Sequence, residues 1–166
     1  MPEIAEKAEL SVATAYRFFP SMEDLRSEYL RSVIEQLADF SESSQEQGRS
    51  LFDQVLAEWL RLQTKFGDAI ISLRSSEGYL TRLRRGEAVI ATTRRAWEEP
   101  IRQLLGELGM QPIPIDEALY LHNLLFDPRD VKDLRTQLGW TEPEIRRRLT
   151  KNYCALLRSW TTEADG

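Results

Sequence analysis

The sequence predicts an all-α protein, on two observations about the spacing of its apolar residues. Apolar residues recur at three- and four-residue steps along almost the whole chain, which is the period of a helix with one buried face. No stretch alternates strictly between apolar and polar residues over the length of a strand. With 42% apolar residues among 166, the chain also has enough apolar side chains for a sizeable core.

Composition and charge exclude several classes of protein. The 22 basic and 27 acidic residues give a formal net charge of −5, which excludes a strongly basic protein that coats nucleic acid. No apolar run approaches the ~20 residues that cross a bilayer, so we expect no membrane partner. The single cysteine cannot form an internal disulfide, and no charged-then-apolar leader precedes the first helical segment. We therefore expect a cytoplasmic protein.

Caps and prolines predict the first three helices. Ser11 is placed to cap the second helix, and Pro20 stops it because the residue before a proline disfavours the helical conformation. Ser21 and Asp24 have the spacing of a capping box and open the third helix, a long one. The three predicted helices cover residues 2–9, 12–19 and 22–40.

The same reasoning divides the rest of the chain. Ser50 and Asp53 are spaced as a capping pair, and Gly67 is expected to end the helix that they open. Glycines at 78 and 86 bracket a segment that the pattern leaves ambiguous. The predicted helices here cover residues 51–66, 68–76, 87–108, 116–126, 128–138 and 142–161.

Two local signals refine the helix over residues 87–108 and the final helix. Pro100 lies inside the helix over residues 87–108, where a proline removes a backbone donor, so we predict a kink. Thr141 and Glu144 have the spacing of a capping box at the start of the final helix.

The most informative string lies in residues 2–25, where two short helices joined by about three residues match a helix-turn-helix. Such a motif lays its second helix in the major groove of DNA. The string resembles the DNA-binding signature of the tetracycline-repressor (TetR) family of transcriptional regulators. The resemblance rests on four segments: Ile4-Ala5-Glu6-Lys7-Ala8, Ser11-Val12-Ala13-Thr14-Ala15-Tyr16, Phe19-Pro20-Ser21 and Glu23-Asp24-Leu25.

The resemblance implies a two-part protein that acts as a homodimer on double-stranded operator DNA. Residues 1–40 would form the DNA-binding domain with its connecting helix, and residues 41–166 a helical bundle for effector binding and dimerisation. The family has a further helix before this string, which the sequence does not include, so we expect the DNA-binding domain here to be incomplete. The residues implied to contact or position DNA are Ser11, Val12, Ala13, Thr14, Tyr16 and Arg17.

Two positions depart from the family pattern. Glu9 stands in the turn where the family usually has glycine, and a residue other than glycine is strained in a left-handed turn. Met22 stands where the family usually has a lysine that binds phosphate.

The resemblance also implies an effector cavity in the bundle for a small molecule of unknown identity. His122 and Asn123 are two polar groups beside apolar leucines and are suited to orient such a molecule. The alternative for each candidate is plain core packing, which is the commoner role of an aromatic residue on a helix. The candidate effector residues are Trp59, Phe66, Tyr79, Trp97, Tyr120, His122, Asn123 and Phe126.

A stripe of apolar residues on the final helix predicts a dimer interface. In the resembled family this helix and the one near residue 119 form a four-helix contact between subunits. The alternative is that the stripe only seals the core of one chain. The candidate interface residues are Leu119, Leu149, Tyr153, Leu156, Leu157 and Trp160.

We therefore expect a repressor that a small-molecule effector releases from a palindromic operator. The alternative is a helical ligand-binding or partner-binding dimer that no longer binds DNA, because residues 1–40 hold four basic and eight acidic residues. We do not expect an enzyme. The one histidine and one cysteine lie 32 positions apart, and no spacing is typical of a metal site or a cofactor-binding loop.

Overall fold

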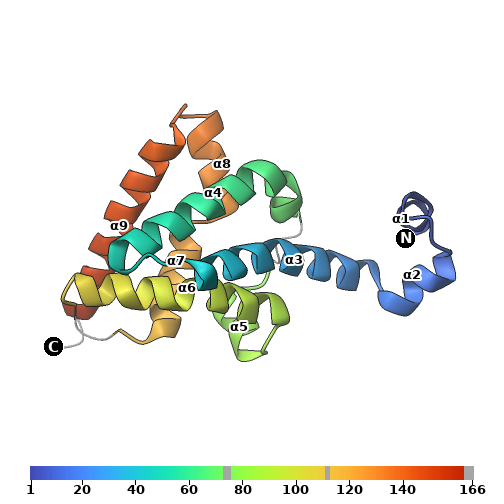
Figure 1. Cartoon of the computed structure of the whole chain (residues 1–166), viewed down its shortest axis with the longest axis horizontal. Helices are drawn as coiled ribbons and strands as arrows, with labels where there is room; N and C mark the ends of the chain where they lie inside the picture. The colour runs from blue at the N-terminus through green and yellow to red at the C-terminus, as the bar shows by residue number, and fades with distance from the viewer. Residues whose placement is uncertain (73–75, 111–112, 163–166) are drawn as a thin grey trace.

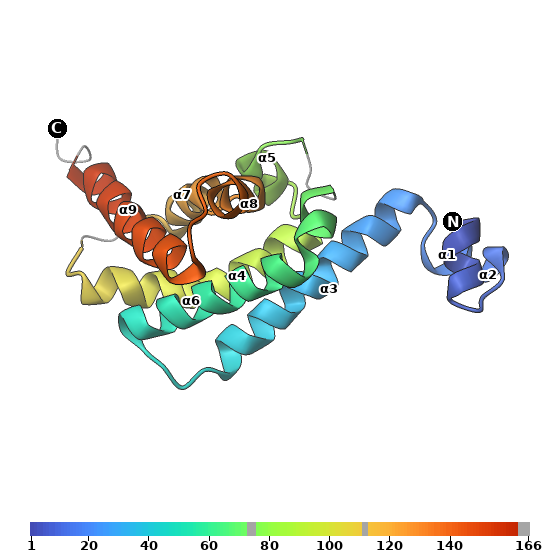
Figure 2. The same ribbon diagram turned by 90° about the horizontal axis from the view of Figure 1, so that it is seen from above.

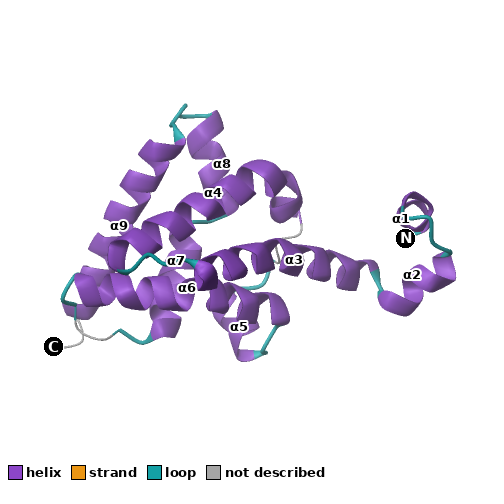
Figure 3. Cartoon of the chain, in the orientation of Figure 1, coloured by secondary structure: helices purple, strands orange, loops and turns teal. Residues whose placement is uncertain are grey.

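The computed structural model describes residues 1–72, 76–110 and 113–162, without the side chains of residues 161 and 162. Every regular element in these ranges is a helix, and no strand occurs in them (Figures 1 and 3), so the predicted fold class, all-α, is confirmed. The helices are α1 (Pro2–Lys7), α2 (Val12–Phe18), α3 (Met22–Ser43), α4 (Gly48–Ser72), α5 (Tyr79–Arg84), α6 (Ala88–Glu107), α7 (Ile115–Leu125), α8 (Pro128–Thr136) and α9 (Glu142–Thr162).

Short-range hydrogen bonds set the boundaries of the first three helices. The Thr14 amide donates to Ser11 Oγ at 3.0 Å, which caps α2 as predicted. Ser21 and Asp24 form the predicted capping box of α3, with reciprocal backbone-to-side-chain bonds of 2.9 and 3.0 Å. Glu9 has a φ of 55°, so the turn between α1 and α2 holds a non-glycine residue in the left-handed region, as the sequence predicts.

The α1–α2 pair stands apart from the other helices. Figures 1 and 2 both show it at the far end of α3, and among the described helices α1 and α2 contact only each other. Within the pair only Ala5 and Ala15 are buried, whereas Phe18 is 62% exposed. The 22 residues of α3 span about 33 Å at ~1.5 Å per residue, and its buried positions begin only at Leu30.

Helix α4 differs from its predicted bounds at both ends. It begins at Gly48, and neither Ser50 nor Asp53 caps it: Ser50 donates to Glu46 at 2.6 Å, and Asp53 pairs with Arg49. The caps come from α6 instead. The Gly48 amide donates to Gln103 Oε1 at 2.7 Å, and the Arg49 amide donates to Glu107 Oε2 at 2.6 Å.

Glycine is favoured at the start of α4. Gly48 has a φ of 57°, and a Cβ at this position would collide with the Glu107 carboxylate that accepts from the next amide. Gly67, in contrast, does not end the helix, so the separate helix predicted over residues 68–76 is wrong. Residues 68–72 continue α4, residues 73–75 lie outside the described ranges, and Ser76 is not helical. A glycine inside a helix costs only about 1 kcal/mol, which tertiary packing of α4 offsets.

The remaining helices agree more closely with the sequence. The segment between Gly78 and Gly86, which the sequence pattern leaves ambiguous, contains the short helix α5. Helix α6 runs continuously through the buried Pro100. At the start of α9 the Thr141 amide donates to Glu144 Oε2 at 2.9 Å, which is one half of the predicted capping box. The kink at Pro100 stays a prediction.

Two layers of helices enclose the core. Figure 2 shows α7, α8 and α9 on one side of a layer formed by α3, α4 and α6. An aromatic cluster lies between the layers: Phe52 stacks on Tyr153 with ring centroids 5.6 Å apart, and Trp97 lies 5.7 Å from Phe52. All three rings are almost fully buried. No described helix combines the length and the apolar character that crossing a bilayer requires.

Candidate functional site

A cavity of about 70 Å³ lies inside the bundle, and we call it the central cavity. Helices α3, α4, α5, α6 and α7 all contribute to its wall. Its lining is mainly apolar and aromatic, which is typical of sites for small molecules. The lining residues are Leu30, Ile34, Leu37, Trp59, Ile70, Tyr79, Arg82, Val89, Ile90, Thr93, Trp97, Leu119, His122, Asn123, Phe126 and Pro128.

Two polar atoms at this cavity have no hydrogen-bond partner among the described residues. They are Tyr79 Oη and His122 Nε2, and both are buried. A buried polar atom without a partner is costly and uncommon in folded proteins. Complementary polar groups on a bound molecule would satisfy these atoms.

The packing around His122 holds its ring neutral. Trp97 lies 4.0 Å from the imidazole centroid on one side, and Phe126 stacks at 4.6 Å. Burial among these rings lowers the pKa of His122 to about 3, because the charged imidazolium loses its hydration. At neutral pH the ring therefore has one N–H donor and one acceptor nitrogen. Nε2 donates or accepts a hydrogen bond according to which tautomer is present.

Tyr79 is the second polar group, and it too is uncharged. Burial, followed by the nearby Asp116 carboxylate, raises the pKa of Tyr79 to about 12. Arg82, the one cation among the residues that line the cavity, is paired with Glu87 at 2.8 Å. The cavity therefore presents hydrogen-bonding groups without an unpaired charge, which suits an uncharged, mainly apolar molecule with one polar group.

Six of the eight predicted effector residues line this cavity: Trp59, Tyr79, Trp97, His122, Asn123 and Phe126. Phe66 lies instead at a separate groove between α4 and α8, and Tyr120 lies beside Trp160 on the other side of α7. Tyr120 is two residues before His122, which is more than half a helical turn, so the two side chains leave α7 in nearly opposite directions.

Sequence reasoning missed several cavity residues. Leu30, Ile34 and Leu37 of α3 form part of the wall, as do Arg82 and Thr93. The apolar stripe of α3 predicted that these positions are buried, but spacing alone does not show which helices cover them.

The six predicted DNA-contact residues lie together on the cap and turns of α2. All are exposed except Thr14, which is half-buried and whose hydroxyl lies 2.8 Å from that of Ser11. Tyr16 is 47% exposed, and the Arg17 guanidinium lies 5.3 Å from the centre of the Phe18 ring. Helix α2 contacts none of the other described helices except α1.

The structure divides the predicted dimer residues into two groups. Leu119, Leu149, Tyr153 and Leu157 are buried within the single chain, where the Tyr153 hydroxyl donates to the Ala118 carbonyl at 2.8 Å. Most of the stripe on α9 therefore seals the core of one chain. Leu156 and Trp160 remain exposed, and Leu124 of α7 is exposed as well.

Metal-binding and thiol chemistry have few candidates here. In the ranges that the structure describes, no three His, Cys, Asp or Glu side chains are grouped as a metal ion requires. Burial raises the pKa of the Cys154 thiol, so it is protonated at neutral pH.

Comparison with known proteins finds no protein-family model, no curated protein and no solved structure that matches this chain. The resemblance of residues 2–25 to TetR regulators therefore stays a prediction from the residues themselves.

Proposed function

We propose that the chain is a DNA-binding transcriptional regulator similar to TetR repressors, which a small-molecule effector releases from a palindromic operator. One observation carries the proposal: α3 has the exposed α1–α2 pair at its N-terminal end and forms part of the cavity wall along its middle turns. In this proposal residues 1–40 form the DNA-binding domain and residues 41–166 bind the effector and the second subunit.

Two features of the α1–α2 pair support a helix-turn-helix. A tight turn at Glu9 joins two short helices, and the first two turns of α2 are accessible along Val12, Ala13 and Tyr16. In a helix-turn-helix the first turns of the second helix meet base edges while neighbouring side chains bind phosphates. We assign base contacts to Val12, Ala13 and Thr14, and phosphate contacts to Tyr16 and Arg17.

The effector would act through α3. Leu30, Ile34 and Leu37 of α3 touch the central cavity, so a molecule that enlarges the cavity displaces this helix. The Arg95 guanidinium on α6 joins three α3 carboxylates, those of Glu35, Asp39 and Glu42, at 2.7 to 2.9 Å. These bonds fix the last turns of α3, so displacement near Leu30 tilts the end that carries α1 and α2.

A palindromic operator requires a two-fold dimer. The exposed residues Leu124, Leu156 and Trp160 on α7 and α9 provide the apolar surface for it. Trp160 is oriented by its indole N–H, which donates to Glu117 at 2.9 Å. An aromatic side chain such as that of Trp160 is typical of the centre of an interface.

Selection from random-sequence duplexes tests the proposal. The chain is expected to enrich a palindromic sequence whose half-sites lie about one helical turn, ~10 base pairs, apart. The Tyr16→Ala variant should enrich nothing above background, while Tyr29→Ala, an exposed tyrosine on α3, should enrich the same palindrome. Absence of any enriched sequence with the unchanged chain would contradict DNA recognition.

The coupling through α3 has its own test. An uncharged compound that binds the chain but not its Trp97→Ala variant should lower operator affinity by about 5- to 150-fold, the usual range of coupling between sites. A compound that binds tightly and leaves operator affinity unchanged would show that the cavity and the α1–α2 pair are independent.

A second candidate is a ligand-binding helical dimer that does not engage DNA. The net charge of −4 over residues 1–40 favours it, because DNA repels an acidic surface. Exposed Ile4, Leu10 and Phe18 on the α1–α2 pair also suit a protein partner better than a phosphate backbone. Failure of the duplex selection together with binding of an uncharged compound would support this candidate.

A further inference from the structure

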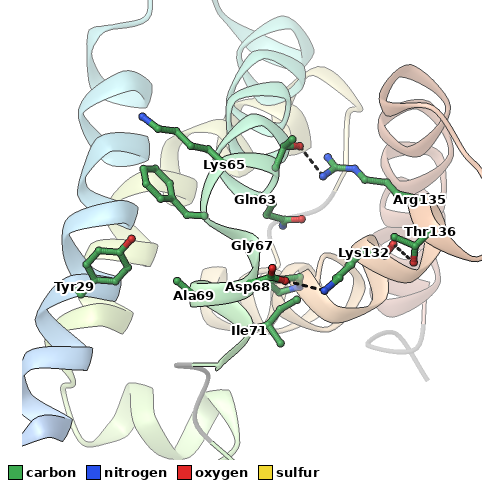
Figure 4. Close-up of a pocket in the computed structure, with 13 residues that line it drawn as sticks. Tyr29, Gln63, Lys65, Gly67, Asp68, Ala69, Ile71, Lys132, Arg135 and Thr136 are labelled. Atoms are coloured by element: carbon green, nitrogen blue, oxygen red, sulfur yellow. Dashed lines mark hydrogen bonds and ion pairs between the residues drawn. The ribbon is translucent and has the colours of Figure 1, made fainter. Parts of the chain in front are cut away.

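A groove of about 410 Å³ between α4 and α8 is separate from the central cavity, and we call it the α4–α8 groove. Figure 4 shows Gln63, Asp68 and Ile71 of α4 facing Lys132 and Arg135 of α8, with Tyr29 of α3 at the opposite side. The volume lies within the range of ~300–1,000 Å³ that is usual for sites of small molecules.

Gln63 is the feature that distinguishes this groove. Its side chain is 6% exposed, yet neither Oε1 nor Nε2 has a hydrogen-bond partner among the described residues. In Figure 4 the amide points toward α8, between Arg135 and Lys132. A primary amide offers one acceptor and one pair of donors side by side, so a group that satisfies both atoms must itself present a donor beside an acceptor.

The charges around Gln63 favour an anion. Arg135 donates to Thr64 Oγ1 at 2.8 Å and to the Leu60 carbonyl at 3.0 Å, both neutral acceptors. It has no carboxylate partner among the described residues, and three of its five N–H donors remain for another group. Lys132 pairs with Asp68 at 2.8 Å, and this bond lowers the pKa of the Asp68 carboxyl. The pair is therefore neutral, and the guanidinium leaves a net positive charge.

A fully deprotonated anion does not satisfy this site. A carboxylate or a phosphomonoester dianion would accept from Arg135 and from Gln63 Nε2, but neither has a donor for Gln63 Oε1. A lactam or cyclic imide, as in the edge of a pyrimidine ring, has an N–H beside a carbonyl and matches both atoms of the amide.

We propose that the α4–α8 groove binds a small organic anion with a lactam edge, whose N–H and carbonyl pair with Gln63 and whose acidic group binds Arg135 beside Lys132. This site is additional to the effector cavity of the proposed function, with which its lining shares only Pro128. Its occupancy does not depend on DNA binding.

Two probes contain both the lactam edge and an acidic group: orotate, a uracil with a carboxylate, and uridine 5′-monophosphate. Calorimetric titration of the full chain should show saturable binding of at least one of them. Uridine, which lacks the anion, and ribose 5-phosphate, which lacks the lactam, should bind at least tenfold more weakly. The His122→Phe variant, altered in the central cavity, should bind the same probe unchanged.

The Gln63→Leu variant separates a binding role from a structural one. Replacing an unpartnered amide with an apolar side chain of similar size removes two unsatisfied polar atoms. We expect the melting temperature of the free chain to rise by about 2–4 °C while binding of the probe falls at least tenfold. An amide that only supports the fold would give a lower melting temperature.

Lys132→Gln tests the charge, since this exposed side chain can change without disturbing the core. Affinity for the probe should fall several-fold, while Lys151→Gln on α9, outside the groove, should leave it unchanged. The proposal is overturned if neither probe binds, if Gln63→Leu retains full affinity, or if Gln63→Leu lowers the melting temperature.

Discussion

The two ends of α3 carry parts of the molecule that are held together in different ways. In the α1–α2 pair only two alanines are buried, and hydrogen bonds between residues three to five positions apart supply most of the order. In the bundle, Phe52, Trp97 and Tyr153 are almost fully buried, and the Phe52 ring packs against both of the others. The pair is thus ordered locally, whereas the bundle is ordered by packing between distant segments.

This difference bears on the proposed function. A closely packed core resists small displacements, while an element with few tertiary contacts moves at little cost. The α1–α2 pair can therefore follow α3 as a unit without repacking the core. The bundle, in which the central cavity lies, provides the stability that a binding site requires.

Phenylalanine occurs in both regions, so the same substitution compares them directly. Phe52→Ala should lower the free energy of unfolding by about 3–5 kcal/mol, because it removes a fully buried ring from the aromatic cluster. Phe18→Ala should change it by less than about 0.5 kcal/mol, since that side chain is mostly exposed. Urea denaturation followed by circular dichroism measures both. Equal losses would contradict the exposed position of Phe18 and the contrast between the two regions.

The pH dependence of stability should also come from the bundle. His122 is the only histidine, with an ordinary pKa of 6.5 and a pKa of about 3 in the folded chain. Its lowered pKa means that stability is fully present above pH 6.5 and is lost as the pH falls toward 3, because only the unfolded chain takes up the proton. By pH 5 the loss should reach about 2 kcal/mol.

Denaturation curves at pH 7 and pH 5 check this expectation. The His122→Phe variant should show almost no difference in the free energy of unfolding between these two conditions. If the free energy of unfolding of the variant still differs between pH 7 and pH 5, the pH dependence comes from other ionisable groups.

A smaller effect than that of His122 is expected in the α1–α2 turn. Glu9→Gly should stabilise the pair by about 0.5–1 kcal/mol, because glycine adopts a positive φ without steric strain. Hydrogen exchange of the Ala15 amide, bonded to the Ser11 carbonyl at 3.0 Å, reports this local change. Glu6→Gly inside α1 is the matched control and should have the opposite sign. Faster exchange in Glu9→Gly would exclude strain at the turn.

The contrast between the regions also explains which features could be predicted from the sequence. The caps of α2 and α3 join residues three positions apart, so they are visible in a local pattern. The caps of α4 come from Gln103 and Glu107, which lie 55 and 58 positions from the amides that they accept from. No local pattern contains that information.

The residues of the candidate sites show the same contrast between local signals and contacts with distant segments. Helical spacing together with the family resemblance led to six cavity residues, because those positions are aromatic or polar on otherwise apolar faces. Gln63 was missed, since an amide on a helix has no unusual sequence context. Its unpartnered state depends on α8, which packs against α4 from more than sixty positions away.

The central claim is that α2 recognises DNA, and direct titration tests it. Fluorescence anisotropy would follow binding of the chain to duplex DNA from upstream of its own gene at two salt concentrations. We predict tight, salt-sensitive binding that Tyr16→Ala abolishes and Tyr29→Ala retains. Binding no stronger than to random DNA, or binding that Tyr16→Ala leaves intact, would contradict the assignment of α2 as a recognition helix.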